Sequence, residues 1–266
     1  GRYVAKDMFE AGGVPLLMKT LLDHGFLHGN CMTVTGRTIA QNLKSVKWNP
    51  GQDVILPANK PLSKTGGVVG LKGNLAPSGA VIKPAACDPK FHVHQGPAMV
   101  FDSYPELKVA IDDENLAITG DHVLVLRNAG PQGGPGMPEW GMLPMPKALL
   151  KKGIRDMVRL SDARMSGTSY GACVLHVAPE SHIGGPLALL KTGDIVKLDI
   201  PNRSIDMLVD KAELVRRKAQ WKAPEPKAGR GYGYMFAQHI EQADTGCDFD
   251  FLHASFGASA KEPDIY

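Results

Sequence analysis

The chain has 266 residues, of which 43% are hydrophobic and 21% charged, and its formal net charge is +3. This is ordinary globular composition, and a chain of this length can bury enough apolar surface to fold without a disulfide or metal staple. So small and scattered a positive charge argues against nucleic acid as a partner. No run of about 18 apolar residues is present that would span a membrane.

The four cysteines are Cys31, Cys87, Cys173 and Cys247, widely spaced and without a Cys-x-x-Cys pair. This spacing argues against a zinc ribbon or a disulfide scaffold, and a reducing cytoplasm is the simplest location for such a chain. The first residues carry neither an initiator methionine nor a signal-peptide layout. We therefore expect the chain to be a piece of a longer protein.

The first part of the chain is predicted to be helical. Apolar residues recur near helical spacing over residues 6–24, and Gly12-Gly13 is expected to break this helix in two, with Pro15 opening the second piece. A short helix is expected over residues 35–43. The irregular, polar residues 44–65 then mark an expected domain boundary.

From residue 66 onward, short β-rich runs alternate with short helices. The expected strands cover residues 67–71, 80–83, 98–101, 122–127, 157–160, 195–200 and 205–209. The expected helices cover residues 106–112, 146–152, 186–190 and 210–220. Pro201-Asn202-Arg203 is predicted to turn a hairpin between the last two strands. Many short strands with few, short helices favour an α/β fold with a closed or strongly curved sheet flanked by helices.

A linker rich in Pro, Gly and Lys follows Trp221 and leads to a predicted helix over residues 232–244 and an aromatic run at 249–252. This layout suggests an arm that packs on another domain or subunit. The alternative is a tail that folds back on its own core.

The stretch "GPQGGPGMPEWGMLP", residues 130–144, holds one charged residue, Glu139, among five glycines and four prolines. Such a sequence cannot form a helix or a central strand. Its lone carboxylate is either a solvated loop side chain or a positioned ligand, and carboxylate oxygen suits Mg²⁺, which takes only one or two protein carboxylates.

The stretch "RLSDARMSGTSYG", residues 159–171, places small residues after an expected strand. Ser166 to Ser169 can cap a following helix. The functional interpretation is a serine oxygen that acts only where a metal, a lysine or a helix N-terminus stabilises its alkoxide. Asp162 and Arg164 either pair locally, or Arg164 grips a substrate carboxylate.

Other polar residues carry less information. His92 and His94 on one face of a strand are a possible metal pair, although surface or hydrogen-bonding histidines are commoner in this arrangement. His176 lies in an apolar run and is predicted to be a satisfied core histidine, and Cys173 is predicted to be small and buried. The glycine-rich runs match neither nucleotide-binding pattern, so no nucleotide cofactor is supported.

Five stretches resemble the signature of the dihydroxyacid and sugar-acid dehydratase family, and the resemblance extends over nearly the whole chain from about Met8 onward. They are residues 73–85, 96–107, 130–144, 159–181 and 184–209. The resemblance is to the carboxy-terminal portion of that family. It implies three parts: a helical end of the amino-terminal domain with a linker (1–61), a barrel-like swivelling β/α domain related to that of aconitase (62–218), and a linker with a helical arm (219–266).

The resemblance also implies an activity. Members of the family remove water from a 2,3-dihydroxy acid with an iron–sulfur cluster and Mg²⁺, giving an enol that becomes a 2-keto-3-deoxy acid. By motif match, Glu139 resembles a Mg²⁺ ligand and Ser166 the base that takes the C2 proton. Thr168 and Arg164 are expected to contact substrate or to support those that do.

Within the family, "SDARMSGTSYG" is more similar to the sugar-acid branch, with substrates such as arabinonate or xylonate, than to the branched-chain amino-acid enzyme. The family's cluster cysteines and other Mg²⁺ ligands are expected upstream of residue 1, so Glu139 is the sole Mg²⁺ ligand expected here. The chain alone is therefore expected to be inactive without its amino-terminal domain, and the complete protein to be a homodimer or homotetramer. The alternatives are a dihydroxyacid dehydratase and a stand-alone module without catalysis.

Overall fold

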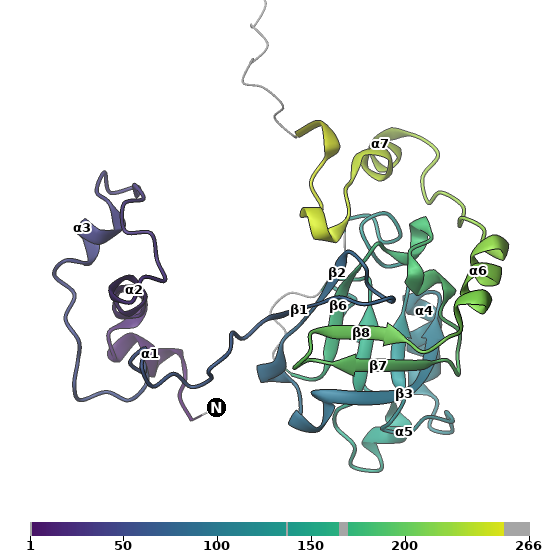
Figure 1. Cartoon of the computed structure of the whole chain (residues 1–266), viewed down its shortest axis with the longest axis horizontal. Helices are drawn as coiled ribbons and strands as arrows, with labels where there is room; N and C mark the ends of the chain where they lie inside the picture. Colours follow the sequence, from purple (N-terminus) through teal and green to yellow (C-terminus); the bar gives the residue numbers. More distant parts are fainter. Residues whose placement is uncertain (1, 137, 165–169, 253–266) are drawn as a thin grey trace, which may run out of the picture. The chain divides into compact units, whose positions relative to one another are not determined.

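The computed structural model describes residues 2–136, 138–164 and 170–252 (Figure 1). The chain divides into two compact units, Gly1–Gly66 and Gly67–Tyr266. The finer division at residues 61 and 218 concerns the family's domains and stays a prediction.

The smaller unit contains three helices: α1 (Ala5–Glu10), α2 (Gly13–Asp23) and α3 (Ile39–Leu43). The expected break between the first two is confirmed, because Gly12 and Gly13 adopt φ values of 126° and 61° that end one helix and start the next. The helix expected from residue 35 begins only at Ile39, since Thr38 caps it with a hydrogen bond from the N–H of Gln41.

The larger unit is built on one eight-stranded sheet in the order β1-β2-β6-β5-β4-β3-β7-β8. The strands are β1 (Val69–Leu71), β2 (Gly79–Ile82), β3 (Val93–Phe101), β4 (Val123–Leu126), β5 (Val158–Ser161), β6 (Cys173–Ala178), β7 (Ile195–Asp199) and β8 (Ser204–Met207). The four central strands, β6, β5, β4 and β3, run parallel, and the outer pairs are antiparallel. The predicted hairpin between β7 and β8 is confirmed.

The two edges of this sheet meet, so that it is nearly closed. The N–H of Lys72 donates to the carbonyl of Arg203 at 2.9 Å, and the N–H of Ile205 donates to the carbonyl of Lys72 at 3.1 Å. The expected α/β class with a barrel-like sheet is thereby confirmed.

Short helices flank the sheet: α4 (Tyr104–Asp112), α5 (Lys147–Leu150), α6 (Lys211–Gln220) and α7 (Gly231–His239). Short 3₁₀ turns complete the chain: Pro84–Ala86, Pro89–Phe91, Ser181–Ile183, Pro186–Leu189, Ala243–Thr245 and Asp250–Leu252. The helix expected over residues 232–244 ends early because Ile240 leaves it to form a β-bridge with Phe249. None of the helices in the described residues has both the length and the apolar character needed to cross a bilayer.

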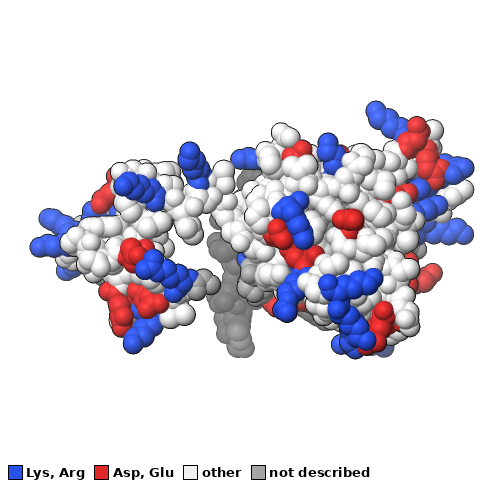
Figure 2. Space-filling model, turned by 90° about the horizontal axis from the view of Figure 1, so that it is seen from below, with Lys and Arg blue, Asp and Glu red and all other residues white. Residues whose placement is uncertain are grey.

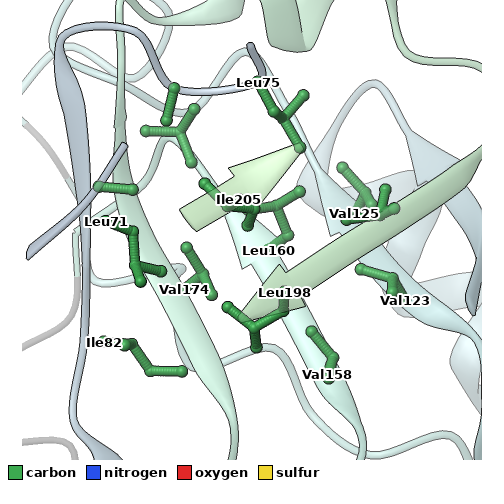
Figure 3. Packing of buried hydrophobic residues seen from close by; sticks show 14 of the residues in the cluster. Leu71, Leu75, Ile82, Val123, Val125, Val158, Leu160, Val174, Leu198 and Ile205 are labelled. Carbon is green, nitrogen blue, oxygen red and sulfur yellow. The ribbon is translucent and has the colours of Figure 1, made fainter. Parts of the chain in front are cut away.

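Two hydrophobic cores lie on opposite faces of the central strands. Val123 and Val125 of β4 point into the barrel, where they meet Val158, Leu160 and residues of the other strands (Figure 3). The alternate residues, Leu124 and Leu126, pack outside against the helices α4 and α5. Because strand side chains alternate between faces, β4 is buried on both and provides a firm base for the loop that follows it.

Two sequence expectations fail here. Strand β6 is not among the expected strands, and the cap considered for Ser166 to Ser169 lies outside the described residues. The strand predicted from residue 98 starts at Val93, because the antiparallel pairing with β7 continues through Gly96 and Pro97.

Charged side chains are mixed on the surface. On the face shown in Figure 2, Lys and Arg side chains of the larger unit are interspersed with Asp and Glu side chains.

Candidate functional site

The structure brings two of the four predicted site residues together. Glu139 lies on the loop after β4, and Arg164 lies on the loop after β5, the neighbouring parallel strand. Parallel neighbours end at the same edge of a sheet, where α/β folds commonly place their sites. The Nη2 atom of Arg164 donates to Oε1 of Glu139 at 2.9 Å, and both side chains are about half exposed.

A backbone contact fixes the same two loops beside this ion pair. The N–H of Gly141 donates to the carbonyl of Arg164 at 2.9 Å. A Cβ at position 141 would lie 2.5 Å from Cδ2 of Leu175 and 2.8 Å from the Arg164 carbonyl oxygen, so only glycine fits where the loops cross. Trp140, next to Glu139, stacks on Tyr104 with ring centroids 5.5 Å apart.

Asp162 holds the start of the Glu139 loop. Its carboxylate has no exposed surface and accepts the N–H of Ala129 at 3.0 Å and the N–H and hydroxyl of Ser181 at 2.9 and 2.6 Å. Burial raises the pKa of Asp162, and these donors oppose the rise. Asp162 therefore does not pair with Arg164, and the local ion pair considered from the sequence is wrong.

Glu180 holds the glycine-rich part of the same loop. Its buried carboxylate accepts the N–H groups of Gln132 and Gly133 at 2.8 and 2.9 Å and the side-chain amide of Gln242 at 2.9 Å. Burial raises the pKa of Glu180. A Cβ on Gly130 would lie 2.6 Å from Oε2 of Glu180. The glycines of this stretch thus let the backbone approach a buried carboxylate.

The described part of the arm folds back on the same loop. Lys227 donates to the carbonyl of Gly133, and the side chain of Gln242 contacts Glu180 in both directions, since its Oε1 atom also accepts the N–H of Glu180 at 2.8 Å. Of the two interpretations of the tail, these contacts match a segment that packs on its own unit.

The larger unit also has a cavity of about 590 Å³, and its lining includes Lys72, Ser78, His176, Arg203 and Asp244. The expectation that His176 is a core histidine is wrong: its side chain is half-buried and lines this cavity, and its backbone adopts a φ of 54°. Burial lowers the pKa of His176, and the positive charge of Arg164 lowers it further. The backbone N–H of His176 donates to the carbonyl of Ala163, the residue before Arg164, at 3.1 Å.

The other two predicted residues, Ser166 and Thr168, lie outside the described residues, so their roles stay predictions. Sequence reasoning missed the supporting carboxylate Glu180, and for Asp162 it considered only a pairing with Arg164. The only signal in the sequence was that each is a single acidic residue among small or apolar residues. A carboxylate in such surroundings needs hydrogen-bond donors when it is buried.

A magnesium ion fits Glu139 only as one ligand among several. Oε1 is engaged by Arg164, and Oε2 has no hydrogen bond to the described residues. Within those residues no three His, Cys, Asp or Glu side chains lie close enough to hold a metal. His92 and His94 instead approach the carbonyls of Pro84 and Asp121 at 3.4 and 3.0 Å.

The described cysteines do not fit an iron–sulfur cluster, whose ligands are thiolates. Burial raises the pKa of the Cys87 thiol to about 12 and that of Cys173 to about 11. Cys173 is buried, as predicted, and Cys31 is exposed in the smaller unit. The roles of Glu139 as a Mg²⁺ ligand and of an iron–sulfur cluster with ligands outside this chain stay predictions.

Comparison with known proteins identifies the family. Residues 53–247 match the dihydroxy-acid/6-phosphogluconate dehydratase C-terminal domain, and residues 1–42 match the corresponding N-terminal domain.

Several relatives are similar over most of this chain. The L-arabinonate dehydratase of Rhizobium leguminosarum is 48% identical over 97% of the chain and 44% of its own length. The 6-deoxy-6-sulfo-D-gluconate dehydratase of Pseudomonas putida is 46% identical over 100% of the chain and 46% of its own length. The dihydroxy-acid dehydratase 2 of Bradyrhizobium diazoefficiens is 50% identical over 92% of the chain and 42% of its own length. The chain spans less than half the length of these relatives, and it belongs to the dihydroxy-acid/6-phosphogluconate dehydratase family.

Proposed function

We propose that this chain is the carboxy-terminal part of a dehydratase that converts a sugar acid, such as arabinonate or xylonate, to its 2-keto-3-deoxy acid. The observation that carries the proposal is the 2.9 Å pairing of Glu139 with Arg164, two residues before Ser166, at one edge of the sheet. Since Ser166 follows Arg164 by two residues, this pairing supports the proposal that the predicted base lies near the predicted metal ligand.

The reaction needs a base at C2 and a positive environment for it. In the proposed step Ser166, as an alkoxide, takes the C2 proton, the C–H electron pair forms the C2–C3 double bond, and the C3 hydroxyl leaves with its bonding electrons and gains a proton to become water. The resulting enol tautomerises to the keto acid. A neutral serine is too weak a base, and the Arg164 guanidinium two residues away is a suitable source of positive charge.

Two cofactors belong to the proposal. Mg²⁺ would be held in part by Glu139 and would supply positive charge to the carboxylate and C2 oxygen of the acid. The iron–sulfur cluster would take its ligands from outside this chain, because the described cysteines do not fit one.

The cavity that His176 lines combines apolar residues with several polar side chains. Lys72, Ser78 and Arg203 in its lining carry hydrogen-bond donors, and Asp244 carries acceptors. The hydroxyl groups of a sugar acid that reached this cavity would pair with these side chains.

Dehydration of the branched-chain 2,3-dihydroxy acid is the second candidate. It is favoured by relatives named dihydroxy-acid dehydratase, one of them 50% identical to this chain.

The proposal includes the amino-terminal domain as a partner and a homodimer or homotetramer as the complete protein. The 266 residues alone are proposed to be inactive, because Glu139 cannot complete a roughly octahedral Mg²⁺ site. This part of the proposal is tested by assaying the isolated chain with sugar acids after anaerobic reconstitution. Turnover by the isolated chain would contradict it.

The activity is tested on the complete protein, joined to its amino-terminal domain and reconstituted anaerobically. Steady-state rates with xylonate, arabinonate and 2,3-dihydroxyisovalerate distinguish the two candidates. Glu139→Gln should weaken the Mg²⁺ dependence, and Ser166→Ala should abolish turnover while the metal stays bound. Glu225→Gln, an exposed linker substitution, is the matched control. A fast Ser166→Ala enzyme would remove the assigned base.

A further inference from the structure

A buried arginine beneath the site contacts both of its loops. Arg159 on β5 is only 2% exposed. Its Nη1 atom donates to the carbonyl of Leu143, on the loop that carries Glu139, at 2.9 Å. Its Nη2 atom approaches the carbonyl of Tyr170, at the far end of the loop that carries Arg164, at 3.5 Å.

Asp156 fixes the guanidinium between these two carbonyls. Its Oδ1 atom accepts from Nη2 of Arg159 at 3.2 Å and also from the N–H groups of Met157 and Ala172 at 2.9 and 3.1 Å. Its Oδ2 atom accepts the N–H of Asp88 at 3.3 Å. Both members of the pair are almost fully buried, so neither can turn away without losing several partners.

The chain leaves room for this guanidinium at Gly171. A Cβ there would lie 1.6 Å from Nη2 of Arg159, and the φ of 102° is one that L side chains rarely adopt. Gly171 is held in place because its N–H donates to the carbonyl of Ala86 at 2.6 Å.

Stability alone does not account for a charge in this place. Apolar replacements of a buried ion pair are often neutral or stabilising, and the Nε atom of Arg159 is buried without a hydrogen-bond partner in the described residues. What the guanidinium adds over an apolar side chain is direction: two of its nitrogens point at carbonyls of two different loops.

We propose that Arg159 is a positioning residue that sets the spacing between the loop of Glu139 and the loop of Arg164 and Ser166. This inference rests on the proposed function, which places the three side chains in one centre. The hydrogen bond from the N–H of Gly141 to the carbonyl of Arg164 crosses the same gap. It therefore reports whether the spacing is kept.

The first test measures backbone hydrogen exchange in the 266-residue chain by NMR. Arg159→Lys keeps the positive charge but lacks the two guanidinium nitrogens that contact the two carbonyls. In this variant we expect the Gly141 N–H to exchange at least about tenfold faster than in the unsubstituted chain. The N–H of Val125, inside β4, should exchange as in the unsubstituted chain. Leu149→Ala is the matched control: it lowers stability from the outer core, so it should accelerate exchange only through global unfolding.

A second variant keeps the test decisive where Arg159→Lys folds poorly. Gly171→Ala retains the arginine and displaces its guanidinium, and it should give the same local acceleration at Gly141. Unchanged protection of Gly141 in a folded variant, or acceleration no greater than in Leu149→Ala at equal loss of stability, would overturn the inference.

The complete protein separates this inference from the proposed function. A misplacement of about 1 Å costs roughly 100-fold in rate, so Arg159→Lys should lower kcat by about that factor while the KM for the acid changes little. An unsubstituted protein without dehydratase activity would contradict the proposed function and leave the exchange result standing. An active protein whose kcat is unaffected by Arg159→Lys would contradict only the role of Arg159.

Discussion

The Oε2 atom of Glu180 accepts a hydrogen bond from the backbone N–H of Gly133 at 2.9 Å, and the Glu180 side chain is fully buried. This contact, with the neighbouring one from Gln132, ties a glycine- and proline-rich loop to a residue beyond the end of β6. The loop of Glu139 is therefore held at its start by buried acids, which makes a fixed position for a half-exposed carboxylate possible.

Glu180→Gln should destabilise the chain by about 1–3 kcal/mol at neutral pH, because an amide nitrogen would face one of the N–H donors that Glu180 now accepts. Urea unfolding measures the loss. Glu225→Gln, in the exposed linker, should leave the free energy of unfolding unchanged. Equal stability of the two variants would show that the buried acid does not hold the loop.

Asp162 should make the fold relatively more stable as the pH is lowered. Burial raises its pKa in the folded state, so from about pH 4 upward the unfolded chain has lost a proton that the folded chain keeps. The free energy of unfolding then falls as pH rises toward the raised pKa. The stability difference between the unsubstituted chain and Asp162→Asn should therefore shrink as the pH rises above about 4 in urea unfolding.

Asp194 is a control, because its pKa is shifted in the direction opposite to that of Asp162. Burial alone would raise its pKa, but hydrogen bonds from Arg217 and the N–H of Lys191 outweigh burial and lower it. Its contribution is present above about pH 4 and is lost as pH falls through the lowered pKa. The difference for Asp194→Asn should stay flat from pH 5 to pH 7, and a parallel slope in both variants would contradict the assignment.

Gly141→Ala should cost about 1–3 kcal/mol, the usual result of forcing a methyl group into a packed site. The methyl would meet Leu175 and the carbonyl of Arg164 at 2.5 and 2.8 Å. Thermal unfolding compares it with Gly229→Ala, where an added Cβ meets nothing within 4 Å. A neutral Gly141→Ala would mean that the two loops are farther apart than described.

Thiol labelling tests the environment of the cysteines. Iodoacetamide at pH 8 should modify the exposed Cys31 rapidly and leave Cys87 and Cys173 unmodified, because only the thiolate reacts and burial raises their pKa values to about 12 and about 11. Mass spectrometry of peptides gives the modified fraction at each site. Rapid labelling of Cys173 in the folded chain would contradict its burial.

The sequence predicts most of the elements because apolar periodicity and turn residues are local signals. β7 and β8 follow from their alternation and from the Pro-Asn-Arg turn. β6 is missed because it is buried on both faces and reads as a short apolar run that periodicity cannot assign. β3 is predicted too short, since pairing with β7 outweighs the strand-breaking tendency of Gly96 and Pro97.

The candidate site is predictable only in part. Glu139 and Arg164 are found through motifs, but their contact depends on the order of strands in the sheet, which no local pattern gives. Arg159, Asp162 and Glu180 act through backbone groups of loops distant in sequence. Their roles are visible only in the folded structure, because a hydrogen bond to the backbone does not depend on the partner's residue type. The sequence shows only the glycines, such as Gly130 and Gly171, that leave space for these side chains.

The burial of β4 on both faces has a consequence for altering this protein. A strand whose side chains are anchored in two cores can accept a changed loop at its end without shifting its own position. Replacing the residues between Gly134 and Trp140 with those of another member of the family should therefore change the environment of the Glu139 carboxylate while the sheet keeps its structure. Diversity of substrates on one barrel would then require exchange of loops alone.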